Sequence, residues 1–278
     1  MTHQSLVKPP LVMGIVNVTP DSFSDGGRHA TIEAALAHAM RMIDQGADVL
    51  DIGGESTRPG SEPVGEAEEI VRVAPLIAAI RARWDGRISI DTMKPGVARA
   101  AVAAGATMWN DVTALSHAPD SLATAAELGC EVVLMHMKGA PKTMQDDPRY
   151  DDVVAEVVAH LAARAEAAMA AGVAREKIWL DPGIGFAKTT AHNLTLTARL
   201  DALVDLGFPV LYAASRKRLI QDVDETAVAA TDRLGGSLAL AMEGARRGAR
   251  MVRVHDVRET VQALKVQAAV ADLFSVRR

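Results

Sequence analysis

Residues 46–52, GADVLDI, contain the unit that decides the fold: a glycine, a short step and a run of mostly apolar residues. The four residues from 49 to 52 have the length and the β-branched content of a buried strand. Upstream, apolar residues from Ile32 to Ile43 recur at intervals of three and four, which predicts an amphipathic helix that ends near Gly46. Glycine suits the position after a helix because it adopts a positive φ without a steric penalty.

The same unit recurs through the chain. Eight apolar runs are predicted to be strands: 11–16, 49–52, 88–91, 107–112, 132–137, 178–181, 210–214 and 251–255. Seven of them follow a glycine that we expect to end the preceding helix: Gly46, Gly86, Gly105, Gly129, Gly172, Gly207 and Gly248. The runs are continuous rather than alternating, which is typical of parallel strands covered on both faces.

Strict alternation of eight strands with eight helical segments predicts an α/β fold, the (β/α)8 TIM barrel, in a single domain over residues 1–278. A doubly wound open sheet is the alternative. That fold usually has a glycine-rich turn after its first strand, and residues 17–22, NVTPDS, contain no G-x-G-x-x-G pattern. We therefore expect the barrel.

Composition excludes several classes of protein. The chain has 278 residues, of which 49% are hydrophobic and 23% charged, and this excludes a disordered chain. A net charge of −5 and an aromatic content of 3% argue against a nucleic-acid partner. No apolar run approaches the roughly 20 residues of a membrane span, and the N-terminus lacks the pattern of a signal peptide. The single Cys130 excludes an internal disulfide, so we expect a cytoplasmic protein.

Every predicted strand leads into polar side chains, among them Asn17, Asp51, Asp91, Asn110, His136, Asp181, Lys217, Arg253 and His255. In a barrel these strand ends meet at one mouth, which is where active sites lie. A single residue of this kind is commonly a helix cap. Many at one mouth indicate a binding site, because buried polar groups cost free energy unless they are paired.

The types of side chain indicate the ligand. Carboxylates and one amide end three of the strands: Asp91, Asn110 and Asp181. This set suits a flat, nitrogen-rich heterocycle that donates several hydrogen bonds. Arg253 and His255, two residues apart and beside Asn17, suit a phosphate group, and Lys217 lies between the two subsites. The mouth therefore predicts a heterocyclic phosphate ester. Two long connections, from Val18 to about Ala30 and from Gly53 to about Gly65, are either binding loops or passive surface.

Eight motifs carry a resemblance to a known family. They are MGIVNVTPDSFSDG at 13–26, GGESTRPG at 53–60, ISIDT at 88–92, WND at 109–111, MHM at 135–137, LDPGIGF at 180–186, SRK at 215–217 and RVHD at 253–256. Together they resemble the dihydropteroate synthases over roughly residues 11–272. The resemblance implies a TIM barrel, a homodimer and Mg²⁺. It also implies a reaction that joins 6-hydroxymethyl-7,8-dihydropterin diphosphate to para-aminobenzoate, releases diphosphate and serves folate biosynthesis.

The resemblance also implies roles for individual residues. It assigns four side chains to the pterin: Asp91, Asn110, Asp181 and Lys217. It assigns Arg253, His255 and Thr57 to the diphosphate and Asn17 to Mg²⁺. Phe23, Pro59 and Phe186 would line the aminobenzoate site. Loss of diphosphate leaves a cation on the dihydropterin ring, which Asp91 would stabilise, while Lys217, Arg253, His255 and Mg²⁺ complete the catalytic set.

Some positions depart from the family's usual pattern. We interpret Ile184, Ala187 and Ala213–Ala214 as changes of packing. Arg218 stands where serine is common, and it either binds the carboxylate of aminobenzoate or extends into solvent beside Asp222.

Three other functions are open at this point. A pterin-binding methyltransferase domain should lack Asn17, Arg253 and His255 as diphosphate groups. A homologue that binds pterin phosphates without turnover would keep the pterin residues. An aldolase would use Lys217 to form a Schiff base. His136 is expected to be a core histidine that bonds a backbone group rather than a catalytic residue.

Overall fold

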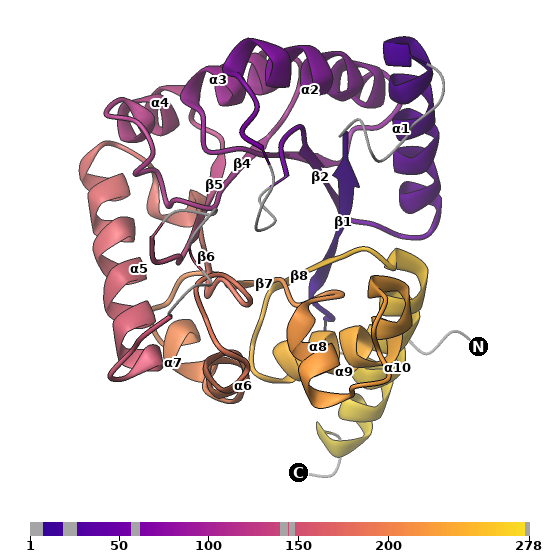
Figure 1. Ribbon diagram of the computed structural model, residues 1–278, viewed down its shortest axis with the longest axis vertical. Helices are drawn as coiled ribbons and strands as arrows, with labels where there is room; N and C mark the ends of the chain where they lie inside the picture. The colour runs from indigo at the N-terminus through magenta and orange to yellow at the C-terminus, as the bar shows by residue number, and fades with distance from the viewer. Residues whose placement is uncertain (1–7, 19–26, 57–61, 140–143, 145–147, 276–278) are drawn as a thin grey trace.

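The computed structural model describes residues 8–18, 27–56, 62–139, 144 and 148–275. Within these ranges the chain forms a ring of strands surrounded by helices, and Figure 1 looks onto one end of that ring. Three of the side chains singled out from the sequence, Phe23, Thr57 and Pro59, lie outside the described residues.

All eight strands are parallel: β1 (Leu11–Asn17), β2 (Val49–Gly53), β3 (Arg87–Asp91), β4 (Met108–Asp111), β5 (Glu131–Met135), β6 (Ile178–Asp181), β7 (Leu211–Tyr212) and β8 (Met251–Val254). Their order is β6-β5-β4-β3-β2-β1-β8-β7, and a parallel bridge between Leu180 and Val210 joins β6 to the segment that enters β7. The ring is thereby closed. This confirms the predicted barrel, and the alternative of an open doubly wound sheet is wrong.

Helices cover the outside of the ring (Figure 1): α1 (Gly27–Asp44), α2 (Glu66–Arg81), α3 (Pro95–Ala103), α4 (Ser121–Leu128), α5 (Val153–Ala170), α6 (Thr190–Ala198), α7 (Asp201–Val204), α8 (Arg218–Val223), α9 (Leu234–Arg246) and α10 (Val257–Ser275). The described residues thus hold ten α-helices rather than eight, because α7 follows α6 in one connection and α8 precedes α9 in another. Two short 3₁₀ helices, η2 (Arg175–Lys177) and η3 (Ala230–Arg233), also lie in connections. None of the helices in the described ranges has the length and hydropathy needed to cross a membrane.

The glycines expected at helix ends behave as predicted, with one exception. Six of the seven have a positive φ: Gly46, Gly105, Gly129, Gly172, Gly207 and Gly248. Gly86 does not, and α2 already ends at Ala82. A Cβ at Gly86 would lie 2.0 Å from the ring of Trp84. Glycine is therefore needed there for close packing and not for a left-handed backbone.

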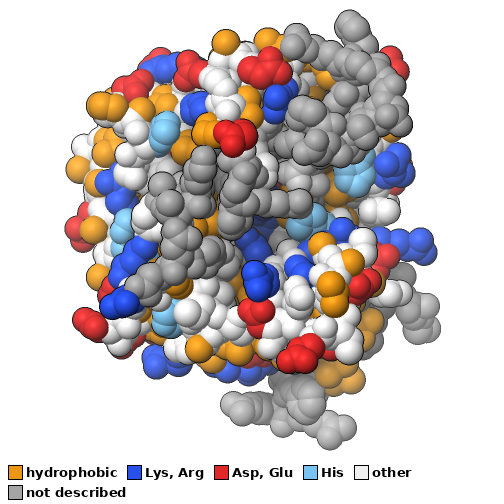
Figure 2. Space-filling view, viewed as in Figure 1, with side chains coloured by type: hydrophobic (Ala, Val, Ile, Leu, Met, Phe, Trp, Pro, Cys, Tyr) orange, Lys and Arg blue, Asp and Glu red, His pale blue; other side chains and the backbone are white. Residues whose placement is uncertain are grey.

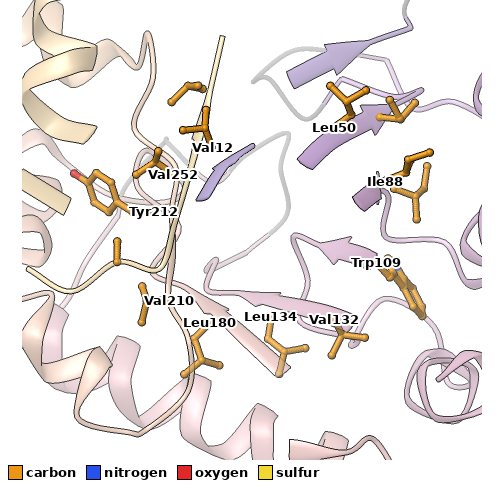
Figure 3. Close-up of a cluster of buried hydrophobic side chains, with 14 of the residues drawn as sticks. Val12, Leu50, Ile88, Trp109, Val132, Leu134, Leu180, Val210, Tyr212 and Val252 are labelled. Carbon is orange, nitrogen blue, oxygen red and sulfur yellow. The ribbon is translucent and has the colours of Figure 1, made fainter. Parts of the chain in front are cut away.

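Successive side chains of a strand point to opposite faces, and this alternation divides the core in two. The outer face packs against the helices, and Figure 3 shows part of this set: Val12, Leu50, Ile88, Trp109, Val132, Leu180, Tyr212 and Val252. The inner face carries seven apolar side chains, here called the inner apolar layer: Met13, Val49, Met108, Val133, Trp179, Leu211 and Met251. Every member is at most 6% exposed, and burial of each such side chain stabilises the fold by about 1.5–3 kcal/mol. Several of them are the first residues of their strands, so the layer fills the barrel at that end.

Candidate active site

Polar side chains stand two positions beyond members of the inner apolar layer on four strands: Asp51, Asn110, Asp181 and Arg253. Side chains two residues apart share a face of the strand, so these groups point into the barrel near the ends of the strands. Asp91, the last residue of β3, is in register with Gly53 on one side and Asn110 on the other. The structure therefore brings together the predicted pterin residues of β3, β4 and β6 with the arginine of β8.

Arg253 connects two of these strands through ion pairs. Its Nε lies 2.6 Å from Oδ2 of Asp51, and its Nη2 lies 2.7 Å from Oδ2 of Asp91. The Asn110 amide also donates to Oδ2 of Asp51, at 3.2 Å. The remaining guanidinium nitrogen of Arg253, Nη1, makes no hydrogen bond to the described residues. Figure 2 shows Lys and Arg side chains reaching the surface at the centre of this face, over the ring of strands.

Burial sets the charge of this cluster. It raises the pKa of Asp91, an effect that the guanidinium of Arg253 opposes and the charge of Asp51 reinforces. Burial alone would lower the pKa of Arg253, but the carboxylates of Asp51 and Asp91 raise it by more, so the guanidinium is a cation. Two carboxylates around one guanidinium leave the cluster with one negative charge in excess when both are ionised.

Asp51 is a member of the site to which the sequence analysis gave no role. It is fully buried, and its Oδ1 has no hydrogen-bond partner among the described residues. A buried acceptor without a partner is rare in folded proteins, and here it faces the interior of a polar mouth. The signal was present in the sequence, because Asp51 ends its strand as Asp91 and Asp181 end theirs.

Asp181, Lys217 and Phe186 form a second group beside the arginine cluster. The Gly183 amide donates to Oδ1 of Asp181 at 2.7 Å, and this bond occupies only one of the two carboxylate oxygens. Burial raises the pKa of Asp181 to about 6, although the Gly183 bond and then the charges of Lys217 and Arg253 lower it. The Lys217 ammonium lies 4.3 Å from the centroid of the Phe186 ring, a cation–π distance. The residues predicted for the pterin and aminobenzoate sites are therefore adjacent.

His255 follows β8 and bonds to the loop after β7. Its Nδ1 lies 3.0 Å from Oγ of Ser215. Burial, and next the charges of Arg253 and Arg216, lower the pKa of His255 to about 3, so the ring is neutral. Arg216 pairs with Asp256, with Nε 3.0 Å from Oδ2, and so ties the two loops together. His255 can therefore serve as a neutral hydrogen-bond donor at this edge.

Asn17 ends β1 next to the acids. A Cβ built at Gly53 would lie 3.6 Å from Oδ1 of Asn17 and 3.8 Å from Oδ2 of Asp91. No group of three His, Cys, Asp or Glu side chains within the described ranges is arranged to hold a metal ion. Mg²⁺ commonly binds through one or two protein oxygens together with substrate phosphates. The single amide oxygen of Asn17 is therefore consistent with Mg²⁺ that also binds substrate phosphates. It is not consistent with a metal ion whose ligands all come from the protein.

Arg218 lies at the start of α8, with its side chain 86% exposed and its Nε 3.6 Å from Oδ1 of Asp222. Of the two alternatives given for Arg218 in the sequence analysis, the structure shows the one in which its side chain extends into solvent beside Asp222. Contact of Arg218 with the carboxylate of aminobenzoate stays a prediction.

His136 is a buried histidine, as expected, but its ring nitrogen Nδ1 contacts a side chain instead of a backbone group. Nδ1 lies 3.0 Å from Nζ of Lys188, whereas the sequence analysis expected a backbone partner. Burial lowers the pKa of His136 to about 3, so the ring is neutral. Ala187, next to Lys188, has a φ of +51°. The interpretation of Ala187 as a change of packing therefore leaves out a constraint on the backbone at this position.

Comparisons with known proteins agree with this geometry. The family described as pterin binding enzyme matches residues 13–255. Dihydropteroate synthase of Escherichia coli K12 is 49% identical over 260 residues, which cover 94% of this chain and 91% of that relative. The solved structure of Xanthomonas albilineans dihydropteroate synthase with 4-aminobenzoic acid is 52% identical, with a TM-score of 0.89, over 95% of this chain and 93% of that one. The structure of the same enzyme in complex with 7,8-dihydropteroate is 49% identical, with a TM-score of 0.86, over 95% and 94%.

Both the sequence match and the structural match extend over nearly the whole barrel, and they include every strand that contributes a polar residue to the mouth. A likeness of this extent is far beyond what a shared fold alone produces. The chain therefore belongs to the pterin-binding enzyme family, among its dihydropteroate synthases, and is a transferase.

Proposed function

We propose that this chain joins 6-hydroxymethyl-7,8-dihydropterin diphosphate to para-aminobenzoate, forming 7,8-dihydropteroate and releasing diphosphate in folate biosynthesis. The observation that carries the proposal is the convergence of Asp51 and Asp91 on Arg253 at the mouth of the barrel. Asp91, Asn110 and Asp181 supply the acceptors and the amide that recognise the edge of a pterin.

In the reaction, the carbon–oxygen bond to diphosphate breaks, and a bond forms between that carbon and the nitrogen of aminobenzoate. The arylamine is neutral at pH 7, and it loses its proton only after the new bond forms, so no strong base is required. As diphosphate leaves, positive charge spreads over the dihydropterin ring. When both acids are ionised, the excess negative charge of Asp51 and Asp91 around Arg253 stabilises that charge electrostatically.

The leaving diphosphate would meet donors on β8 and directly after it, Arg253 and His255. Arg253 offers Nη1, because Nε and Nη2 already bond the two acids. His255 donates from Nε2 if the Ser215 hydroxyl donates to Nδ1, an arrangement that the 3.0 Å distance allows. Asn17 would hold Mg²⁺ through its amide oxygen, and the ion supplies positive charge to the leaving group when bound.

The test is the release of diphosphate, measured with and without para-aminobenzoate, together with mass-spectrometric detection of 7,8-dihydropteroate. We expect release to require both aminobenzoate and Mg²⁺. Binding of the pterin diphosphate without any turnover would instead support a pterin-binding homologue that catalyses nothing. Removal of Mg²⁺ with a chelator, followed by its return, tests the metal separately.

The proposal includes a homodimer. On α10, Val266, Val270 and Leu273 are 60%, 50% and 58% exposed, and their spacing of four and three residues places them on one helical stripe. Such a stripe is typical of a surface that a partner covers. Sedimentation equilibrium should give twice the chain mass of 29.4 kDa, and Val270→Glu should reduce it to the monomer mass. A cytoplasmic location accords with the one cysteine, Cys130, which is buried and free.

A further inference from the structure

Lys188 is a buried cationic residue to which the mechanism above gives no part. It is 3% exposed. Its Nζ lies 2.9 Å from the carbonyl oxygen of Phe186, 3.1 Å from that of Gly183 and 3.3 Å from that of His136. The fourth contact is Nδ1 of His136 at 3.0 Å. Burial lowers the pKa of Lys188 to about 7, an effect that the charge of Asp181 opposes. Carbonyl oxygens only accept hydrogen bonds, and an ammonium ion only donates them, so this shell favours the charged form of Lys188, which prevails below pH 7.

The shell belongs to two different elements. His136 follows β5, whereas Gly183 and Phe186 lie in the loop after β6. This loop has an unusual backbone, with φ of +68° at Gly183 and +51° at Ala187. A Cβ at Gly183 would lie 2.0 Å from the carbonyl oxygen of His136, so the loop packs directly on the end of β5. Lys188 bonds both sides of that contact.

The same loop leads into the pterin subsite. Gly183 accepts from Lys188 through its carbonyl oxygen, and through its amide it donates to Oδ1 of Asp181 at 2.7 Å. Phe186, whose carbonyl oxygen also bonds Lys188, carries the ring that contacts Lys217. Lys188 therefore bonds the loop that both contacts the Asp181 carboxylate and carries the Phe186 ring.

We propose that Lys188 is a positioning residue of the pterin subsite, whose amino group holds the loop after β6 on His136 and so keeps Asp181 and Phe186 in place. The inference rests on the proposed function, because it presumes a pterin at Asp181. An ionised carboxylate accepts from two neighbouring N–H groups of a heterocycle, whereas a protonated one must use one oxygen as a donor. Burial raises the pKa of Asp181, and the charge of Lys188 lowers it after the larger effects of the Gly183 bond, Lys217 and Arg253.

Several other charged or titratable groups lie near Lys188 and Asp181, and they also contribute to any change of binding with pH. They are Lys217 after β7, Arg253 of β8, Lys138 after β5, His136 at the end of β5 and His160 of α5. The ring of His160 lies 4.9 Å from that of His136, and burial lowers the pKa of both histidines. Without Lys188, Lys217 and Arg253 would remain as the cations that favour an ionised Asp181.

Calorimetric titration of 6-hydroxymethyl-7,8-dihydropterin diphosphate with Mg²⁺, from pH 5.5 to 8, tests the role of Lys188 without requiring turnover. We expect Lys188→Met to raise Kd by about ten-fold or more near pH 6, the order of 1.4 kcal/mol. The acid limit of binding is defined here as the pH at which Kd has risen about ten-fold above its value at pH 8. We also expect this acid limit to move to higher pH in Lys188→Met. Lys177→Met is the matched control, because Lys177 bonds one carbonyl oxygen, that of Gly129, next to the opposite end of β6. It should bind as the wild type does.

A thermal melt shows whether Lys188→Met folds, and Lys188→Arg provides a second variant that retains the positive charge. Lys188→Arg should keep the acid limit of the wild type even where its Kd rises. A Lys188→Met protein with the Kd and the acid limit of the wild type would overturn the inference, as would a Lys188→Arg protein whose acid limit moves. Absence of synthase activity in a wild-type protein that binds the pterin normally would overturn the proposed function instead, and the Kd comparison would still decide the role of Lys188.

Discussion

Asp91 contributes charge rather than shape to the site. It is bonded at 2.7 Å to Arg253, and burial holds its pKa above the ordinary value of an aspartate. Asp91→Asn keeps the size of the side chain and can still accept a hydrogen bond, but it cannot offset a developing cation. We expect kcat to fall by about 10²–10³-fold with little change in thermal stability. Steady-state kinetics beside a thermal melt check this, and a near-normal kcat would remove Asp91 from its role.

Arg218 tests whether an exposed side chain takes part in binding. Because it is 86% exposed and paired only loosely with Asp222, its ordering on substrate binding would have to overcome solvent screening. We expect Arg218→Ser to leave the KM for para-aminobenzoate unchanged within about two-fold, which corresponds to less than 0.5 kcal/mol. A selective ten-fold rise in this KM, with the KM for the pterin diphosphate unchanged, would show instead that Arg218 binds the carboxylate.

Ala187 is a small residue in a left-handed conformation, with φ of +51°. Alanine is strained there, and glycine is not, so we expect Ala187→Gly to stabilise the fold by roughly 0.5–1 kcal/mol. Urea unfolding measures the change. Ala174→Gly is the matched control, because Ala174 has a φ of −65°, and the same substitution there should destabilise the fold. A loss of stability in both variants would show that φ at Ala187 does not govern the effect.

At the scale of elements, an ion-pair network holds the base of the connection between β2 and α2. Glu55 accepts from the Val64 amide at 2.9 Å with one oxygen and from Lys94 at 2.5 Å with the other. Lys94 also bonds Glu69 of α2 at 2.6 Å, and Glu69 is fully buried. The two ends of the connection are therefore joined to each other and to the start of α3, which Lys94 precedes.

Removal of the cation from this network should be costly in a pH-dependent way. Lys94→Met leaves the buried Glu69 carboxylate without its partner, and we expect a loss of about 3–5 kcal/mol in the free energy of unfolding at pH 7. Burial raises the pKa of Glu69, and the lost ammonium no longer lowers it. The folded variant therefore binds a proton more readily than the unfolded chain, so its deficit should shrink as the pH falls. Urea unfolding at pH 7 and pH 5 checks this, with Lys265→Met on the exposed face of α10 as a control. A deficit that grows towards pH 5 would contradict it.

The sequence predicts helices and strands well where apolar residues recur at a regular spacing. It predicts them poorly where loops distant in the sequence contact one another. Strand β6 has its predicted bounds, whereas β7 spans two residues, Leu211–Tyr212, instead of 210–214. The strand pairing stops at Tyr212, and in the loop that follows Arg216 adopts a φ of +57° and pairs with Asp256. That pair joins residues 40 positions apart, and no local pattern indicates it.

The same distinction separates the site residues. The alternation of strand side chains was enough to place Asp91, Asn110, Asp181 and Arg253 at one mouth. It was not enough to find Lys188, which lies in an irregular loop and bonds a histidine 52 positions earlier in the chain. Pattern arguments reach groups fixed by the strands, whereas contacts between loops depend on three-dimensional packing.

At the scale of the whole molecule, the barrel separates structural and chemical tasks along its axis. The seven side chains of the inner apolar layer fill the end at which the strands begin. The acids and Arg253 occupy the end at which the strands finish. Repetition of one strand–helix unit makes this division predictable from the chain, since four strands carry a polar side chain two positions after a member of the inner apolar layer.

The inner apolar layer has a consequence for the order of events in a catalytic cycle. Because its members are at most 6% exposed, the layer fills the barrel at the end opposite the acids. We therefore expect the finished product to leave by the mouth, which is also where the next pterin enters. Product and pterin diphosphate cannot pass one another, so we expect 7,8-dihydropteroate to inhibit competitively against the pterin diphosphate. Initial rates at several product concentrations would show this as a rising KM at constant kcat, whereas a falling kcat at saturating pterin would indicate a second route out of the barrel.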